Sequence, residues 1–445
     1  GRREPCRPRS PNRAARRCGR RASRAPASRG RRLYPACRRR ILEAAFIGYA
    51  AYYLVRNNLP VVSAEMGARL GYDKSMIGDI LAATAISYGV GKLVMGWFSD
   101  RSSPRRFIAL GLALTACLNF AFGASSDFRL HLALWAVNGF VQGMGYGPCA
   151  TSLAHWYGLK ERGAVFGFWN MAHNAGGGLV GVIAAWAASC WGWRSAFFVP
   201  GLLALAGSAY LAWRMRDAPP SLGLPTIEEH LGEPPPSHDR SAAGGVPEGI
   251  FKRHILPNKT LWLIAFANFF VYIARYSMLD WGPTYLKEVK GASLGHGGLS
   301  TLLLEFSGAL GMLATGWLSD RIGGRRGLVS AACMAPCVLV FWALTLTPPG
   351  MLWLDLALLS LIGFLVYAPV MMLGVMSLDL TAKEAAGTAA GFVGLFGYLG
   401  RVVQGKGIGW IAQHHGWGPA LTCVLACAAF AALLLSLTWN IRPKE

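Results

Sequence analysis

Long apolar runs recur along the chain, and they limit its possible folds more than any other feature. They cover residues 108–123, 179–188, 202–213, 328–346 and 421–439. A helix needs roughly 20 mostly apolar residues to cross the hydrocarbon core of a bilayer, and these runs reach that length with their Gly- and Ser-containing flanks. Only 15% of the residues are charged, whereas soluble domains carry about a quarter. The sequence therefore predicts an all-α membrane protein.

Twelve such spans can be placed, six on each side of a polar connection. The first six cover residues 41–64, 77–98, 108–124, 132–150, 164–188 and 196–213, and the second six cover residues 261–286, 299–318, 328–346, 352–373, 386–411 and 419–439. Residues 214–260 are rich in Pro, Glu, Gly and Ser, which is typical of a linker. We therefore expect an N-terminal half over residues 41–213 and a C-terminal half over residues 261–440.

The first 40 residues hold sixteen arginines and one acid, Glu4. Such an Arg-, Pro- and Ser-rich segment cannot form a core, so residues 1–40 are predicted to be a disordered arm. A cytoplasmic tail fits this segment better than nucleic-acid binding, because positive charge gathers on the cytoplasmic side of membrane proteins. The short loops on that predicted side are also richer in Lys and Arg, so both termini are expected in the cytoplasm. The ten cysteines are scattered without a CxxC pair, so neither a metal site nor a disulfide framework is expected.

A repeat relates the two halves at an offset of about 220 residues. The segment GWFSDRSSPRR at residues 96–106 recurs as GWLSDRIGGRR at residues 316–326. Parallel six-helix repeats are the arrangement of major facilitator transporters, whose substrate site lies between the halves. Asp100, Arg101, Asp320 and Arg321 in these twin loops are therefore candidates for ion pairs that rearrange as the halves rock. The alternative is that the loops only anchor the spans on the cytoplasmic side.

Three cations inside predicted spans are the main site candidates, since burying a charge in a membrane is costly and therefore marks function. Arg56 and Arg275 occupy matching positions in the two halves, so both are expected to face the central cavity and clamp an anion through bidentate hydrogen bonds. Lys92 has no basic counterpart and marks an asymmetric site. The alternative is that these cations pair with the buried acids Asp280 and Glu305.

One histidine and several tyrosines are weaker candidates. His173 lies in the middle of a span, where a histidine is more often hydrogen-bonded in place than a ligand. Tyr53 and Tyr272 each precede a clamp arginine by three residues and could donate to an anion, although such tyrosines, like Tyr398, more often pack.

Several motifs resemble one branch of the major facilitator superfamily. YYLVRNN at residue 52, GMGYGPC at residue 143, FWNMAHNAGGG at residue 168 and RYSMLDWGPTYLKEVKG at residue 275 resemble those of the organophosphate:inorganic phosphate antiporters, especially the glycerol-3-phosphate and hexose-phosphate transporters. The resemblance covers residues 42–442. It implies that Arg56 and Arg275 hold the phosphate, that His173 and Lys92 add contacts, and that Tyr272 and Tyr398 line the site.

The chain departs from this family at positions that bear on specificity. Asn57 stands where glycerol-3-phosphate transporters have a lysine, and Arg401 and Lys406 stand in the eleventh span, where that branch is apolar or small. We therefore expect positive charge to have moved from the first span to the eleventh, which would reshape the pocket around the organic part of the substrate.

The resemblance implies a secondary transporter of the bacterial inner membrane that exchanges a small organophosphate for inorganic phosphate by a rocker-switch mechanism. No cofactor, metal or nucleic acid is expected, and the expected unit is a monomer in the lipid bilayer. The sequence contains neither a GxxxxGK[ST] motif nor an evident nucleophile and base pair, so ATP use and enzymatic activity are not expected. Two alternatives stay open, namely a membrane-embedded organophosphate sensor and a proton-coupled symporter that uses Asp280, Glu305 or His173.

Overall fold

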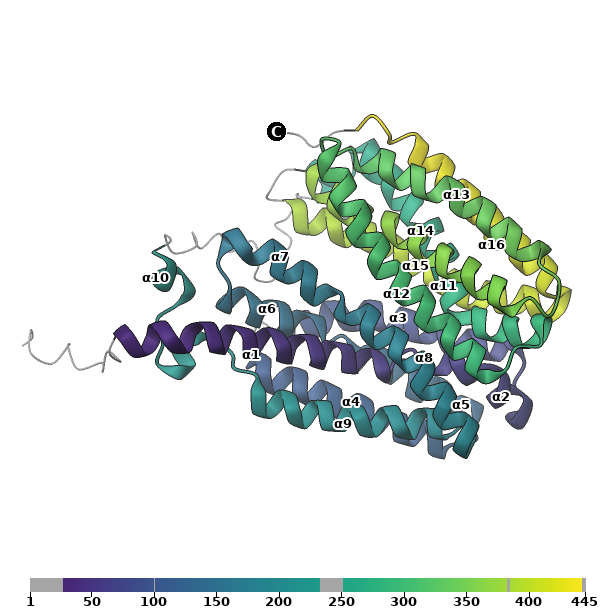
Figure 1. Cartoon of the computed structure of the whole chain (residues 1–445), viewed down its shortest axis with the longest axis horizontal. Coiled ribbons are helices and arrows are strands. Elements are labelled where there is room, and N and C mark those ends of the chain that lie inside the picture. The colour runs from purple at the N-terminus through teal and green to yellow at the C-terminus, as the bar shows by residue number, and fades with distance from the viewer. Residues whose placement is uncertain (1–26, 100, 233–250, 382–384, 442–445) are drawn as a thin grey trace, which may run out of the picture.

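The computed structural model describes residues 27–99, 101–232, 251–381 and 385–441, and within these ranges the chain forms helices and connections without a strand (Figure 1). Eight helices are long and apolar enough to cross a membrane by length and composition. The other predicted spans either are divided into shorter helices or, like α15 (Ala386–His415), carry charges that lower their hydropathy. These features confirm the prediction of an all-α membrane protein in two six-span halves.

The N-terminal half contains three spans that are each built from two helices. Its helices are α1 (Ala27–Leu54), α2 (Leu59–Leu70), α3 (Lys74–Ser99), α4 (Pro104–Ala124), α5 (Phe128–Gln142), α6 (Tyr146–Trp156), α7 (Leu159–Asn170), α8 (Ala172–Trp191) and α9 (Ser195–Arg214). The pairs α1 with α2, α5 with α6 and α7 with α8 form the first, fourth and fifth spans. In Figure 1, α1, α4 and α9 lie side by side along one face of this half.

The C-terminal half is built from six long helices. They are α11 (Lys259–Lys290), α12 (Leu294–Arg321), α13 (Arg326–Leu346), α14 (Leu352–Asp379), α15 (Ala386–His415) and α16 (Trp417–Ser436). Pro283, Pro336 and Pro369 lie inside α11, α13 and α14, which continue through them. The same repeat therefore produces unbroken helices in this half.

The arm predicted over residues 1–40 is shorter than expected, because α1 begins at Ala27. Tyr34 is fully buried, its ring stacks on His230 at 4.0 Å between centroids, and its hydroxyl donates to the Pro225 carbonyl at 3.2 Å. Arg38 forms an ion pair with Glu161. These aromatic and ionic contacts outweigh the polar composition of residues 27–40, while residues 1–26 lie outside the described ranges.

The predicted linker also contains ordered helical turns. They are η1 (Pro219–Leu222), α10 (Ile227–Leu231) and η3 (Phe251–Ile255), and residues 233–250 lie outside the described ranges. Ile227 is buried against the N-terminal half and Ile255 against the C-terminal half. The linker is therefore attached to both halves, and the end of the molecule that carries it is called the linker end below.

The two halves meet toward the opposite end, called the far end, which carries the turns at Gly71 and Gly291. Two helix pairs approach closely there. A Cβ atom added to Gly78 on α3 would lie 2.5 Å from the Gly405 carbonyl oxygen on α15, and one added to Gly181 on α8 would lie 2.5 Å from that of Gly298 on α12. Only glycine allows this backbone approach, so the far end is closed.

Candidate anion-binding site

A cavity of about 190 Å³ lies between the two halves, and tyrosines dominate its wall. It is lined by Tyr49, Tyr53, Tyr88, Lys92, Tyr146, Asn170 and His173 of the N-terminal half and by Tyr272, Arg275, Tyr276, Met312, Tyr367, Val370, Met371 and Tyr398 of the C-terminal half. Six of the seven residues predicted to bind substrate are in this wall. The remaining one, Arg56, is not.

Arg275 enters the cavity from the middle of the unbroken helix α11. Its guanidinium carbon lies 4.0 Å from the ring centroid of Tyr367 and 4.9 Å from that of Tyr276. The residue is buried, and its Nε has no hydrogen-bond partner among the described residues. A cation that is buried against aromatic faces and keeps a free donor can bind an anion that enters the cavity.

Arg56 lies one layer behind the wall, in the break between α1 and α2. Its guanidinium carbon stands 3.8 Å from the ring centroid of Tyr88 and 5.1 Å from that of Tyr53, and both tyrosines line the cavity. The two matching arginines therefore approach the cavity differently. Arg275 borders it, whereas Tyr88 separates Arg56 from it.

Buried amides satisfy the backbone groups that the break at Arg56 leaves free. The Val55 carbonyl accepts from Asn119 Nδ2 at 3.0 Å and from Asn138 Nδ2 at 3.1 Å. Asn58 Nδ2 in turn donates to Asn119 Oδ1 at 2.8 Å and to the Ala196 carbonyl at 3.0 Å. Since unpaired backbone groups are costly inside a membrane, this amide network makes the break tolerable.

Lys92 and His173 add polar groups to the wall contributed by the N-terminal half. The Lys92 ammonium lies 5.1 Å from the ring centroid of Tyr146. His173 Nδ1 donates to the Asn170 carbonyl, and its ring centroid is 5.7 Å from that of Tyr53. That bond orients the imidazole and leaves Nε2 for other partners.

The buried acid Asp280 pairs with Arg401 rather than with a clamp arginine. Arg401 Nη2 lies 3.6 Å from Asp280 Oδ1, and both side chains are almost completely buried. The Arg401 guanidinium also lies 4.0 Å from the ring centroid of Tyr276, which borders the cavity. Arg401 therefore neutralises the acid from one layer behind the wall.

The second buried acid, Glu305, connects the two halves. Its Oε2 and backbone carbonyl accept from Asn174 Nδ2 at 2.9 Å and 3.1 Å. Next to this contact, a Cβ on Gly177 would lie 3.1 Å from Glu305 Oε1 and 3.3 Å from Asn57 Nδ2. Asn57 therefore lies beside Glu305 and places a neutral amide there.

Lys406 lies away from the cavity, toward the far end. Its ammonium contacts Asp79 Oδ1 at 2.7 Å and Ser75 Oγ at 2.9 Å, and both partners belong to the opposite half. Of the two cations in the eleventh span, only Arg401 touches a residue of the cavity wall. Lys406 instead joins the halves.

In the twin loops Arg101 and Arg321 occupy matching positions, and within the described residues neither of them nor Asp320 forms an ion pair. Arg326, at the end of the second loop, pairs instead with Asp379 on α14. Arg101 lies 4.0 Å from the ring centroid of Trp97, and Arg321 lies 3.9 Å from that of Trp317. Asp320 is exposed, and Asp100 lies outside the described residues. The role of these four residues in gating therefore stays a prediction.

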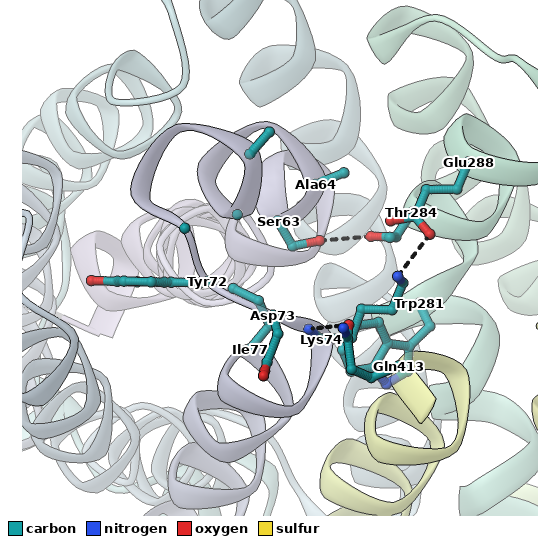
Figure 2. A pocket seen from close by; sticks show the side chains of 13 residues that line it. Ser63, Ala64, Tyr72, Asp73, Lys74, Ile77, Trp281, Thr284, Glu288 and Gln413 are labelled. Atoms are coloured by element: carbon teal, nitrogen blue, oxygen red, sulfur yellow. Dashed lines mark hydrogen bonds and ion pairs between the residues drawn. The ribbon is translucent and has the colours of Figure 1, made fainter. Parts of the chain in front are cut away.

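A second cavity of about 430 Å³ lies at the far end, between α2, α3, α11 and α15 (Figure 2). Three contacts cross it between the halves: Ser63 Oγ to Thr284 Oγ1 at 2.7 Å, Lys74 Nζ to Glu288 Oε2 at 3.0 Å, and Lys74 N to Gln413 Oε1 at 3.1 Å. Lys287 also forms an ion pair with Glu65. Polar contacts therefore reinforce the closure of the far end.

The sequence reasoning missed five tyrosines of the wall, Tyr49, Tyr88, Tyr146, Tyr276 and Tyr367. Tyr146-Gly147-Pro148 and Tyr367-Ala368-Pro369 occupy matching positions in the repeat, which was the available signal for Tyr146 and Tyr367. No such signal marked the other three: Tyr88 and Tyr276 contact Arg56, Arg275 and Arg401, and Tyr49 packs against Tyr53. Among the described residues, no group of His, Cys, Asp or Glu could hold a metal ion.

Comparison with known proteins identifies the family. Residues 45–405 match the model of the Major Facilitator Superfamily. The chain is 38% identical to a probable hexose phosphate transport protein of Chlamydia trachomatis serovar D and 38% identical to the glycerol-3-phosphate transporter of Bacillus subtilis, covering 93% and 92% of this chain and 93% of each relative. It is 35% identical to the membrane sensor protein UhpC of Escherichia coli K12, over 92% of this chain and 94% of that protein.

A solved structure agrees with the fold. It is a bacterial homologue of the human lysosomal transporter Spinster, in an inward-facing and unoccupied conformation, with a TM-score of 0.75 and 15% sequence identity, and the match covers 91% of this chain and 97% of that one. The fold and the relatives are those of multi-pass membrane transporters and not of enzymes. The chain therefore belongs to the major facilitator superfamily and, within it, to the organophosphate:phosphate antiporter family.

Proposed function

We propose that this protein exchanges a small organophosphate for inorganic phosphate across the bacterial inner membrane. The observation that carries the proposal is the tyrosine-lined cavity between the halves, with Arg275 in its wall and Arg56 directly behind Tyr88. Relatives named as hexose phosphate and glycerol-3-phosphate transporters support this choice of substrate class. We further propose that the protein works as a monomer.

The charges around the cavity suit a phosphate dianion. Four buried or cavity-lining cations, Arg56, Lys92, Arg275 and Arg401, stand against two buried acids, Asp280 and Glu305, which leaves two positive charges. A guanidinium matches phosphate oxygens with two parallel hydrogen bonds. A phosphate bound to Arg275 would draw Arg56 forward as Tyr88 turns aside, so both halves would hold one ligand.

Binding of this kind would couple the ligand to the movement of the halves. The Lys and Arg distribution predicts that the linker end faces the cytoplasm, so a chain closed at the far end is open toward the inside. Without an anion, closing the linker end would bring uncompensated arginines together in a low-dielectric site. A bound phosphate removes that cost. The loaded protein therefore reorients more readily than the empty one, which favours exchange.

Specificity for the organic part is assigned to the region behind Tyr276. Arg401 neutralises Asp280, and Asn57 adds no charge beside Glu305. Arg275 therefore has no carboxylate within ion-pair distance among the described residues. These contacts support the proposal that positive charge moves from the first span to the eleventh, with Arg401 as its carrier.

A second candidate function is sensing, because a relative at 35% identity is named a membrane sensor protein. A sensor would bind the same ligand through the same arginines but would carry little flux. The two functions therefore differ in transport and not in the site.

Proteoliposomes preloaded with radiolabelled phosphate test the proposal. Glycerol-3-phosphate, glucose-6-phosphate and 3-phosphoglycerate are added outside, one at a time, and phosphate efflux is measured. At least one of them should stimulate efflux from liposomes with the wild type, and none should do so with Arg275→Lys. Arg129→Lys is the matched control, since Arg129 is exposed and does not line the cavity. Ligand binding without stimulated efflux would favour the sensor, and efflux that follows a pH gradient without phosphate would favour proton coupling.

A further inference from the structure

An exposed tryptophan stands among arginines where α9 ends, at the linker end. Trp213 has 61% of its surface exposed, and the guanidinium carbons of Arg40 and Arg214 lie 5.6 Å and 5.4 Å from its ring centroid. Figure 1 shows α9 and α1 on the outer face of the N-terminal half. Tryptophans in such positions are enriched at the level of the lipid headgroups.

Three arginines from different parts of the chain converge on the last carbonyls of α9. Arg40 Nη2 and Arg216 Nη1 both approach the Trp213 carbonyl oxygen, at 3.5 Å and 2.8 Å, and Arg105 Nε donates to the Ala212 carbonyl. Two guanidinium groups thus share one acceptor. Their like charges repel, so an anion between them would be stabilised.

The nearby acids are already occupied by other donors. Glu43 accepts from the Tyr210 hydroxyl at 2.6 Å and from Arg214 at 3.3 Å. Asp217 accepts from Ser103 Oγ at 2.7 Å and from the Arg105 amide at 2.8 Å. Among the described residues, neither Arg40 nor Arg216 therefore forms an ion pair with a carboxylate.

The electrostatics at Arg216 agree with this geometry. Partial burial, followed by the neighbouring charges of Arg105 and Arg40, lowers the pKa of the Arg216 guanidinium. Asp217 acts in the opposite direction but less strongly. The cluster thus carries more positive charge than its own acids compensate.

Capping of the α9 carboxyl end explains part of this arrangement, because cations stabilise the negative end of a helix dipole. One arginine would suffice for the Trp213 carbonyl, however, whereas two approach it. Capping also does not require a large exposed indole beside the cluster. Both features fit a phosphate group at the membrane surface, since basic pockets between membrane helices bind anionic lipid headgroups.

We propose that Arg40, Arg105 and Arg216 bind the phosphate of an anionic phospholipid in the leaflet at the linker end, with Trp213 against its glycerol region. The bound lipid joins α1, the start of α4 and the first residues of the linker. It therefore braces the linker end of the N-terminal half, at a site separate from the central cavity.

Native mass spectrometry of the full chain in detergent tests the site, by titration with phosphatidylglycerol and with phosphatidylethanolamine. The wild type is expected to hold one phosphatidylglycerol at least about tenfold more tightly than phosphatidylethanolamine. The double variant Arg40→Gln/Arg216→Gln should lose this preference. The control Arg101→Gln/Arg321→Gln should keep it, because each of these arginines contacts a tryptophan without a second arginine at its carbonyl.

A second measurement uses tryptophan fluorescence with brominated phosphatidylglycerol. The difference in quenching between the wild type and Trp213→Phe gives the contribution of Trp213. Brominated phosphatidylglycerol should quench Trp213 in the wild type but not in the double arginine variant. Equal lipid retention by the wild type and that variant would overturn the proposal. Displacement of the lipid by millimolar inorganic phosphate or glycerol-3-phosphate would also overturn it, because the site would then take soluble phosphates. A melting temperature without lipid that matches the wild type shows that each variant is folded.

Discussion

The two halves of the molecule carry the same repeat on different backbones. In the N-terminal half, Tyr53 and Arg56 lie where the first span breaks, whereas in the C-terminal half Tyr272 and Arg275 lie inside the unbroken helix α11. The residues that follow explain the difference. Pro60 cannot donate the helical hydrogen bond to the Arg56 carbonyl, whereas the matching bond in α11 is intact because Leu279 follows Arg275 at the same distance.

The difference shows that the two arginines of a pseudosymmetric pair can have different roles. Arg275 lies in the cavity wall on the unbroken helix α11, against two aromatic rings. Arg56 lies behind Tyr88 on a segment that an amide network supports. We therefore interpret Arg275 as the fixed half of the phosphate clamp and Arg56 as its moving half.

Removing one partner of a buried ion pair should have the largest effect on stability. The cavity region of the C-terminal half contains a buried ion pair, whereas the break in the N-terminal half is supported by neutral amides. Arg401→Leu leaves Asp280 without its partner, and breaking a buried pair in this way costs about 3–5 kcal/mol. The melting temperature in detergent should fall sharply, and the double variant Arg401→Leu/Asp280→Leu should recover most of the loss. Lys406→Met is the control at a half-exposed pair, and an equal fall there would contradict the assignment.

Replacing each clamp arginine by lysine sharpens the contrast between fixed and moving partners. Arg275→Lys keeps the charge but removes the planar fork, and a charge-assisted hydrogen bond is worth about 1.5–3 kcal/mol, so phosphate exchange should fall about 10- to 100-fold. Arg56→Lys should lower phosphate exchange less than Arg275→Lys does, because Arg56 stands behind Tyr88 in the described state. Equal losses in initial rates of phosphate exchange would argue that both arginines border the cavity equally.

The amide network beneath the break predicts a loss of stability in one half only. Asn119→Ala removes one of the two donors to the Val55 carbonyl and one of the two acceptors of Asn58, and each such hydrogen bond contributes about 0.5–1.5 kcal/mol to stability. Thermal unfolding in detergent should therefore start at a lower temperature. Leu339, which lies 220 residues later and is 64% exposed, provides the matched control, and Leu339→Ala should leave the transition nearly unchanged.

The closed far end predicts the smallest effect, a shift in conformational equilibrium. A side chain at Gly78 meets the backbone of α15, whereas one at Gly89 on the same helix meets nothing within 4 Å. Gly78→Val should therefore disfavour closure and lower phosphate exchange about tenfold, which corresponds to about 1.4 kcal/mol, while Gly89→Val should transport normally. The rate at which a thiol reagent labels Ser63→Cys should be higher in the Gly78→Val background than in the wild-type background. An unchanged rate would show that the glycine contact does not hold the far end closed.

The sequence was sufficient to predict the fold class and six residues of the cavity wall. The length of the apolar runs and the internal repeat each depend on many residues. They therefore predict the all-α architecture in two halves even where single spans are broken into two helices. Tyr53, Lys92, His173, Tyr272, Arg275 and Tyr398 were predicted, because buried charge and the repeat mark them. Tyr88 and the position of Arg56 behind it could not be predicted, since they depend on how a broken span packs against α3. The helical residues 27–40 were missed for a similar reason, because Tyr34 is buried by contacts with the folded linker and with Trp156.

Equilibrium binding of radiolabelled phosphate to the purified protein tests the central claim that one arginine from each half holds the same anion. The wild type, Arg56→Gln, Arg275→Gln and the double variant are compared under one set of conditions, with melting temperatures as a check on folding. If both arginines bind one phosphate, each single variant should weaken binding at least about tenfold, and the double variant should lose clearly less than the two single losses combined. If Arg56→Gln binds phosphate as tightly as the wild type, Arg56 stays behind Tyr88 and the two-half clamp is wrong.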